Sequence, residues 1–363
     1  MRHAATGAPF DERGGRLRGA IDLAAGRYPG FLFGLPPGRL LPVFHFHETT
    51  VDAFEPVCRY LVENGYRTVV SDDAARFVRE GKSPGDRSVM LAFDDAWSSL
   101  WLVVGPLLRR YDLRAVAYVI PARTVDADAV RPTIDDGPTD AERADRSSQP
   151  FCTWPELRAL ALSGRVDVQS HTWSHSMIFT GEKVVGAVGP DFAREPRLNR
   201  PRIDSGGPIE FLEPDRIGYP LFARRSRMSD GRRFFPDAEA CARAEAFATQ
   251  AKGAGGAVVR VEGTWESDDD RAAETERELD RAREEIAVRV GMPVRHVCLP
   301  WGVSGQRTRA ALERLGFVSA FANRWAGRFA VGAGDDPYYL KRLNGRLIFG
   351  LPGRGRKTFA FLG

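Results

Sequence analysis

Apolar and polar positions alternate in regular blocks from residue 41 onward. Short apolar runs, typical of strands, are followed by longer segments in which apolar residues recur every three or four positions, as in amphipathic helices. Repeated strand–helix units of this kind predict a parallel sheet, either open or closed into a barrel. The predicted strands cover residues 41–47, 66–70, 88–93, 115–120, 166–169, 295–299 and 317–321, and the predicted helices cover 51–64, 72–79, 100–111, 154–162, 275–290 and 305–315.

Two stretches interrupt this pattern. Residues 121–150 are rich in Asp, Arg, Pro and Thr, and indicate a surface loop. Residues 176–270 are rich in Gly, Pro and Arg, with aromatic islands around Phe211, Tyr219 and Phe234. The second stretch is too aromatic for a disordered linker, so it predicts an insertion that caps a functional site, with aromatic rings available to stack on a ligand.

Length and composition fit one interrupted α/β region. The 363 residues are 43% hydrophobic and 28% charged, which is ordinary for a soluble globular protein. We expect an N-terminal extension over residues 1–40 and the α/β region over 41–363. The net charge is only +4 and the basic residues are dispersed, which argues against a nucleic-acid binder but allows peripheral contact with an anionic membrane surface.

Cysteine usage and the start of the chain predict a cytoplasmic protein. The four cysteines lie far apart and form no CxxC pair, as expected of reduced thiols. No apolar secretory segment is visible, and no apolar run is long enough to cross a bilayer. The sequence leaves the oligomeric state open.

Acidic and imidazole side chains gather where predicted strands end. Asp94 and Asp95 directly follow one apolar strand, and His171 and His175 follow another. Each pair alone has an ordinary explanation, as a helix cap or as surface residues. Together they lie where α/β folds assemble catalytic sites. Four-residue spacing would place both imidazoles on one face of a helical turn, where they could grip one divalent cation together with one aspartate. The other aspartate would be free to act as a base.

These residues carry a family resemblance. Residues 91–95 resemble the T-F-D-D-G motif of the polysaccharide deacetylase (NodB-homology, carbohydrate esterase family four) superfamily, and residues 171–175 resemble its H-[ST]-x-x-H motif. Residues 297–302 resemble the third motif, which contains a Pro-Tyr-Gly turn. The resemblance covers residues 41–175 and 272–321. It implies an α/β fold, a deformed (β/α) barrel of the polysaccharide deacetylase type with a large insertion.

The resemblance also implies roles for the matching residues. Asp95, His171 and His175 would hold a divalent metal, zinc in the first place, although iron, nickel or cobalt would suit the same ligands. Asp94 would be the general base, and the backbone N–H of Trp301 would stabilise the oxyanion. The expected contacts with substrate are His45, Trp97, Trp173 and Pro300, although simple packing explains His45 equally well.

The chain departs from the family pattern at three places. Ala96 stands where the first motif usually has glycine, and Cys298 stands where many members carry an arginine that braces the base. No histidine follows His296, although many members place the catalytic acid late in the chain. One branch instead uses a histidine at the end of its first strand, which His47 matches, so His47 is the expected acid. Arg342 is the candidate for the missing brace.

Taken together, these features predict a metal-dependent hydrolase that removes an N-acyl group, by expectation N-acetyl, from an amino sugar. The expected cytoplasmic location favours a small-molecule or lipid-linked amino-sugar substrate. Two alternatives remain: a catalytically silent carbohydrate-binding relative, and an amidase that acts on a non-sugar C–N bond. A metal-independent amidase with Cys298 as nucleophile is a poorer reading, because this thiol lies in an apolar strand with no nearby base except His296.

Overall fold

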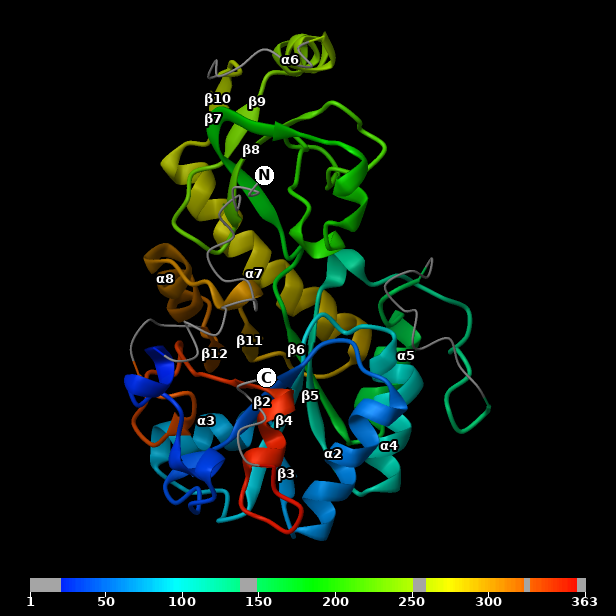
Figure 1. Ribbon diagram of the computed structural model, residues 1–363, viewed down its shortest axis with the longest axis vertical. Coiled ribbons are helices and arrows are strands. Elements are labelled where there is room, and N and C mark those ends of the chain that lie inside the picture. The colour runs from blue at the N-terminus through cyan, green and yellow to red at the C-terminus, as the bar shows by residue number, and fades with distance from the viewer. Residues whose placement is uncertain (1–20, 138–148, 251–258, 323–326, 358–363) are drawn as a thin grey trace. The chain divides into compact units, whose positions relative to one another are not determined.

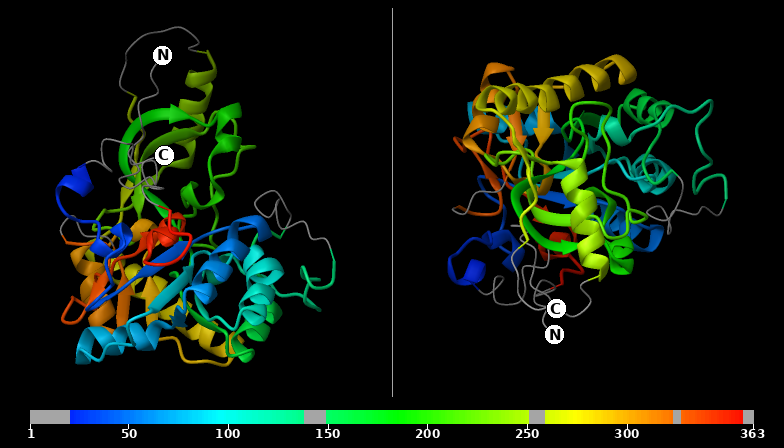
Figure 2. Two further views of the ribbon diagram at one scale, coloured as in Figure 1. Left: turned by 60° about the horizontal axis from the view of Figure 1, so that its bottom comes forward. Right: turned by 90° about the horizontal axis from the view of Figure 1, so that it is seen from above.

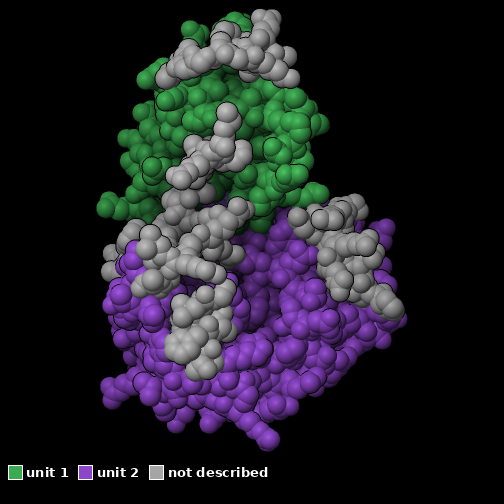
Figure 3. All heavy atoms as spheres, viewed as in Figure 1, with its two compact units in different colours: residues 1–12, 175–277, 303–311 green, residues 13–174, 278–302, 312–363 purple. Residues whose placement is uncertain are grey.

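Figure 1 shows a computed structural model of the protein, which describes residues 21–137, 149–250, 259–322 and 327–357. Parts of the predicted extension (1–40), of the loop (121–150), of the insertion (176–270) and of the C-terminal end therefore lie outside the described residues. Contacts divide the chain into two compact units, coloured separately in Figure 3. The first unit contains residues 175–277 and 303–311, and the second contains 13–174, 278–302 and 312–363.

The second unit is built on a parallel sheet. Among the described residues this sheet has eight strands, in the order β12-β11-β6-β5-β4-β2-β14, with β3 paired to β4. Phe321 of β12 bridges to Leu340 just before β14, so the sheet is curled. The predicted deformed (β/α) barrel is therefore confirmed. The strands are β2 (Val43–Phe46), β3 (Arg67–Val69), β4 (Ser88–Phe93), β5 (Ala115–Val119), β6 (Val166–Ser170), β11 (His296–Cys298), β12 (Ser319–Phe321) and β14 (Leu343–Asn344).

Helices follow most of these strands, and α2, α4 and α5 lie side by side against the sheet (Figures 1 and 2). The predicted capping box opens α5, because Thr153 N donates to the Glu156 carboxylate. No helix in the described part of the chain has the length and apolar character needed to cross a membrane. The helices are α2 (Val51–Glu63), α3 (Ser71–Glu80), α4 (Gly105–Arg110), α5 (Trp154–Leu162), α6 (Ala238–Gln250), α7 (Asp268–Val290) and α8 (Gln306–Arg314).

Two predicted helices differ from the structure. The segment predicted as one helix over 100–111 begins with a π-helical turn, Leu100–Val104, before α4. Helix α7 begins at Asp268 rather than at residue 275. Its start is fixed by Ser267, whose hydroxyl accepts the N–H of Asp270, and by acidic residues in the first turn, which the helix dipole favours.

Alternation along the strands sorts side chains between the two faces of the sheet. On β4, Leu91 and Phe93 pack in the cluster that contains α2, α4 and α5, whereas Met90 and Ala92 pack in the opposite cluster. Since successive strand residues point to opposite faces, Asp94 continues on the Met90 face. The other members of that opposite cluster include Val43, Val116, Tyr118, Cys298 and Phe321.

The first unit has a core of its own. Phe222 makes edge-to-face contacts with Phe179 and Phe234, at centroid distances of 5.0 and 5.6 Å. Tyr219 is buried in the same cluster. Of the rings that we expected to stack on substrate, Tyr219, Phe222 and Phe234 are therefore core residues, and that expectation is wrong for them. The unit's strands are β7 (Met177–Ala187), paired antiparallel with β8 (Pro220–Ser226), and β9 (Phe234–Pro236), paired antiparallel with β10 (Gly263–Trp265).

Short elements complete the fold. Strand β1 pairs antiparallel with β13, and one-turn or two-turn 3-10 helices connect larger elements. These elements are β1 (Leu40–Leu41), β13 (Val331–Gly332), η1 (Gly30–Phe33), η3 (Pro121–Arg123), η5 (Pro190–Arg194), η6 (Arg197–Asn199), η7 (Pro300–Gly302) and η8 (Gly345–Gly350).

Candidate metal and catalytic site

Asp94 and Asp95 can serve one site because the backbone leaves the strand between them. Adjacent residues of a regular strand point to opposite faces. Asp94 N still donates to Phe46 O at 2.9 Å, as in the pairing of β4 with β2. Asp95 and Ala96 then adopt left-handed backbone, with φ of 65° and 52°. This turn brings the second carboxylate to the same end of the sheet, and Ala96 adopts the conformation that glycine would adopt more readily.

A carboxylate and two imidazoles form the candidate metal centre. Asp95, His171 and His175 each offer one ligand atom, and these atoms lie within 4.8 Å of one another. All three residues are buried. This donor set suits a divalent transition ion and leaves coordination positions for other ligands. The residues therefore fit the metal that the resemblance implies.

The two histidines do not lie on a helical turn, so that prediction is wrong. Residues 171–175 form a loop after β6, with left-handed backbone at Thr172 (φ 66°) and His175 (φ 51°). His175 follows Ser174 directly at the boundary between the two units. The four-residue spacing still brings the imidazoles together, but through a strained loop rather than through helical periodicity.

His171 is oriented by a backbone carbonyl. Its Nδ1 lies 2.6 Å from the carbonyl oxygen of Cys298, to which it can donate, and its Nε2 then lies 3.3 Å from Asp95 Oδ1. Such an outer hydrogen bond fixes the tautomer of a ligating histidine. Burial disfavours the charged imidazole, but the contacts with Cys298 and Asp95 outweigh it and raise the pKa of His171. A proton and a metal cation therefore compete for Nε2.

Asp94 is held by Arg342. The two guanidinium nitrogens Nη1 and Nη2 donate to Oδ1 and Oδ2 at 2.6 and 2.8 Å, a bidentate pair. Burial would raise the pKa of Asp94, but the charges of Arg342 and His171 outweigh it and hold the pKa well below its usual range. Asp94 is therefore an anion, and its partner Arg342, directly before β14, is the residue that the sequence predicted as a brace.

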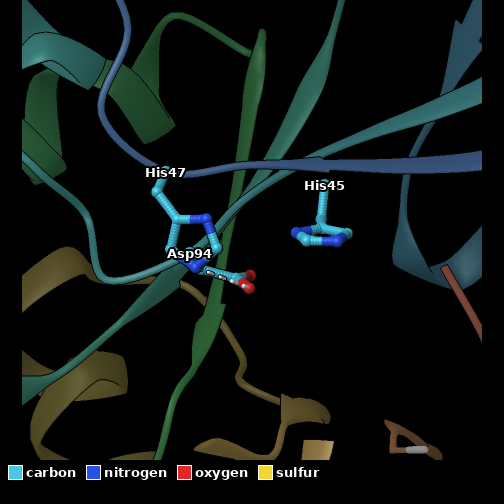
Figure 4. Close-up of side chains that lie close together, drawn as sticks. All are labelled: His45, His47 and Asp94. Carbon is cyan, nitrogen blue, oxygen red and sulfur yellow. Dashed lines mark ion pairs between the residues drawn. The ribbon is translucent and has the colours of Figure 1, made fainter. Parts of the chain in front are cut away.

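His45 and His47 approach Asp94 from β2 and its end (Figure 4). His47 Nε2 lies 3.8 Å from Asp94 Oδ2 and 4.0 Å from Asp95 Oδ2, and its side chain is 38% exposed. Burial and the charge of Arg342 lower the pKa of His45 to about 3, so His45 is neutral. These two histidines and Asp94 also cluster closely enough to hold a cation. However, both Asp94 oxygens already accept from a guanidinium, so we assign no metal there.

The tryptophans expected to contact substrate have other partners. Trp97 Nε1 donates to Asp95 Oδ2 at 3.1 Å, and its ring lies 4.7 Å from that of Phe151. The guanidinium of Arg281 lies 3.7 Å from the centroid of the Trp173 ring. Trp97 thus orients a candidate metal ligand, and substrate contact by either ring stays a prediction.

The third motif forms a tight turn after β11. Pro300 and Trp301 belong to η7, and Trp301 has left-handed backbone with φ 53°. The roles expected for Trp301 in oxyanion binding and for Pro300 in substrate binding stay predictions. Cys298, at the end of β11, is fully buried, and burial raises the pKa of its thiol. This disfavours the thiolate that a cysteine nucleophile needs.

Glu278 is the residue near the site that our reading of the sequence missed. This buried side chain of α7 accepts hydrogen bonds from Ser174, inside the loop that carries the histidines. The hydrophobic pattern of α7 could have indicated this residue. Glu278 shares the buried stripe of α7 with Thr275, Ala282 and Ile286, and a carboxylate on an apolar stripe requires a polar partner.

Comparison with known proteins bears directly on this site. The family model described as polysaccharide deacetylase matches residues 81–187, which contain both aspartates and both histidines. The match assigns this region of the chain to the polysaccharide deacetylase superfamily.

Two relatives indicate how far the similarity extends. The chain is 30% identical over 129 residues to the poly-beta-1,6-N-acetyl-D-glucosamine N-deacetylase of Escherichia coli K12. That alignment covers 36% of this chain and 18% of the relative, so the chain spans only a small part of the relative's length. The structure of the BpsB deacetylase domain from Bordetella bronchiseptica matches with a TM-score of 0.52 at 16% identity, over 85% of this chain and 96% of that one. At this identity, the match shows the fold alone.

Proposed function

We propose that the protein is a metal-dependent hydrolase that removes an N-acyl group, most simply N-acetyl, from an amino sugar. The observation that carries this proposal is the division of labour between two adjacent carboxylates. Asp95 lies within ligand distance of two imidazoles, whereas Asp94 is paired with Arg342. One is therefore available to a metal, and the other is kept anionic and in a fixed orientation for proton transfer.

Asp95, His171 and His175 would hold the divalent ion. Zinc suits these ligands best, and iron, nickel or cobalt also suit them. When bound, such an ion polarises an acyl carbonyl and lowers the pKa of water. The carbonyl of Cys298 and the indole N–H of Trp97 orient His171 and Asp95. Outer contacts of this kind commonly tune metal affinity.

Proton transfer would use Asp94 and His47. Asp94 takes a proton from the attacking water, whose oxygen bonds to the carbonyl carbon. His47 lies near both aspartates and is partly exposed, so it can deliver a proton to the amine nitrogen as the C–N bond breaks. The products are a free amine on the sugar and a carboxylate. His45, which is neutral, is proposed as a hydrogen-bonding contact with the sugar.

The backbone N–H of Trp301 would stabilise the oxyanion. Its turn follows directly from β11, whose end also supplies the carbonyl that orients His171. One preorganised donor of this kind contributes about 3–4 kcal/mol in other acyl-transfer enzymes. Pro300 limits the conformations of this turn and is proposed to contact the acyl group.

The substrate is proposed to be an N-acetylated amino sugar. The sequence favoured a small-molecule or lipid-linked sugar. Because the E. coli relative is named for a polymer of N-acetyl-D-glucosamine, we add polymers of this sugar as candidate substrates. The role of residues 176–270 as an active-site cap stays a proposal.

Acetate release tests the function. The full chain is stripped with a chelator, reloaded with zinc or cobalt, and incubated with N-acetylglucosamine, its β-1,6-linked oligomers and a lipid-linked analogue. We expect release only from the reloaded protein, and loss of both metal and release in His171→Ala. Equal release by stripped protein would contradict metal dependence. Stoichiometric metal without release from any substrate would instead indicate a silent binding relative.

A further inference from the structure

The loop that carries the two histidines is held in an unfavourable conformation. Thr172 and His175 are not glycines, yet both have left-handed backbone. This backbone conformation is rare for residues other than glycine and persists only where the surrounding structure fixes it. Ser174, directly before His175, is fully buried, so its contacts help to fix where His175 is placed.

Ser174 is fixed by one carboxylate. Glu278 Oε2 accepts the backbone N–H of Ser174 at 2.9 Å, and Oε1 accepts its hydroxyl. Both residues are buried, with Glu278 only 2% exposed. The low dielectric of a buried site strengthens such hydrogen bonds. A single side chain thus fixes both the backbone and the side chain of the residue before a metal ligand.

The same turn of α7 holds the neighbouring residue. The backbone carbonyl of Glu278 accepts the N–H of Trp173 at 2.8 Å, and Arg281 covers the Trp173 ring. On the other side, Trp173 O accepts the N–H of Ala122, just after β5. The loop is therefore clamped between α7 and the end of β5. Glu278 lies outside the loop, so a conservative substitution there changes the clamp without altering the loop's own sequence.

We propose that Glu278 is a positioning residue for the metal centre: its carboxylate fixes the loop so that His175 joins Asp95 and His171. The inference rests on the proposed metal site. The group that could hold the ion consists of Asp95, His171 and His175, so Glu278 would act on it indirectly, through Ser174. Loss of the clamp is expected to weaken metal binding, since removal of a partner that orients a ligand typically costs 10–100-fold in affinity.

The test is zinc affinity measured by calorimetry on chelator-stripped full-length protein. In Glu278→Gln, one of the two amide positions can no longer accept from Ser174. We expect zinc affinity to fall by about tenfold or more, with kcat largely recovered at saturating zinc. Ser174→Ala, which removes only the hydroxyl donor, is expected to give a smaller loss. Glu284→Gln, at an exposed position of the same helix, is the matched control and should match the wild type.

The reference variant His175→Ala separates the two proposals. If His175→Ala leaves zinc affinity unchanged, the metal site itself is wrong. If His175→Ala loses zinc while folded Glu278→Gln and Ser174→Ala bind it as tightly as the wild type, only the positioning role of Glu278 is overturned. If Glu278→Gln fails to fold, Ser174→Ala alone decides: weakened binding supports the clamp, and wild-type affinity overturns it.

Discussion

Two neighbouring aspartates acquire different chemistry from their separate partners. Asp95 faces His171 and receives the indole N–H of Trp97, whereas Asp94 is paired with Arg342 on both oxygens. The left-handed backbone at Asp95 makes this possible, since it turns the second carboxylate toward the site. Changes of single residues should therefore separate metal binding from proton transfer.

Asp94 should need a paired guanidinium to act as a base, and an arginine on another strand should be able to supply it in place of Arg342. Arg342→Ala leaves a buried Asp94 without its ion-pair partner, and breaking a buried pair in this way costs about 3–5 kcal/mol. We expect kcat to fall by about 100-fold or more, with Arg342→Lys intermediate because lysine lacks the bidentate fork. The family resemblance implies that an arginine at the position of Cys298 could also reach Asp94. Cys298→Arg in the Arg342→Ala background should therefore restore part of kcat, and wild-type kcat in Arg342→Ala would refute the brace.

The indole N–H of Trp97 should contribute to metal affinity by orienting Asp95. Trp97→Phe keeps an aromatic ring against Phe151 but removes the donor to Asp95 Oδ2. Metal affinity measured by titration should fall by about tenfold. Trp101→Phe is the matched control, since the Trp101 indole donates to the carbonyl oxygen of Arg131, away from the metal ligands. Equal affinity in both variants would show that the Trp97 hydrogen bond does not tune the metal.

At the scale of elements, the sequence revealed features that depend on local patterns but not those that depend on contacts between distant parts of the chain. The apolar runs located β4 and α5 to the residue, because a fully buried strand and a capping box leave clear patterns. The sequence motifs predicted that both aspartates and both histidines belong to one site, and the structure brings Asp95, His171 and His175 together. The loop conformation of residues 171–175 was not predictable from spacing, because it depends on Glu278, more than a hundred positions away in the chain. The pairing of Arg342 with Asp94 likewise depends on how β14 closes the sheet.

A polar network at the opposite, amino-terminal ends of the strands should make stability depend on pH. His296 at the start of β11 contacts Ser319 of β12 through Nδ1 and Asp72 of α3 through Nε2, at 2.8 and 2.9 Å. The hydrogen bond from His296 lowers the pKa of Asp72. A lowered folded-state pKa stabilises the protein above the unfolded value of about 3.9, and this stabilisation is lost as the pH falls through the folded pKa.

Thermal unfolding of Asp72→Asn checks this network. The wild type should unfold at a higher temperature than Asp72→Asn at pH 7, and the difference should shrink as the pH falls below about 4. Asp86→Asn, at an exposed position, serves as control and should show little difference at either pH. A difference that grows at low pH would contradict the assignment.

At the scale of the whole molecule, the chain forms two units with separate cores. The insertion contributes the aromatic cluster around Phe222, while the sheet and its helices form the larger core around residues such as Leu107. We therefore expect each unit to open locally without the other. The sequence revealed the interruption through composition, but it could not show which aromatic rings would be buried.

Hydrogen exchange on two core variants tests this division. Phe222→Ala removes a fully buried ring, a change that typically destabilises by about 3–5 kcal/mol. Amide protection should fall in β7 and β8 and persist in β4 and β5. Leu107→Ala should produce the reverse pattern. An equal loss of protection in both units for either variant would mean that the two cores unfold as one.

The central claim is that Asp94 is a base and Asp95 a ligand. The most direct test is the rate of acetate release by zinc-loaded Asp94→Asn, with bound zinc determined in the same sample. The substitution preserves shape but removes the proton acceptor, so we predict full zinc content and a loss of kcat of about 100-fold or more. Wild-type turnover by zinc-loaded Asp94→Asn would contradict the account.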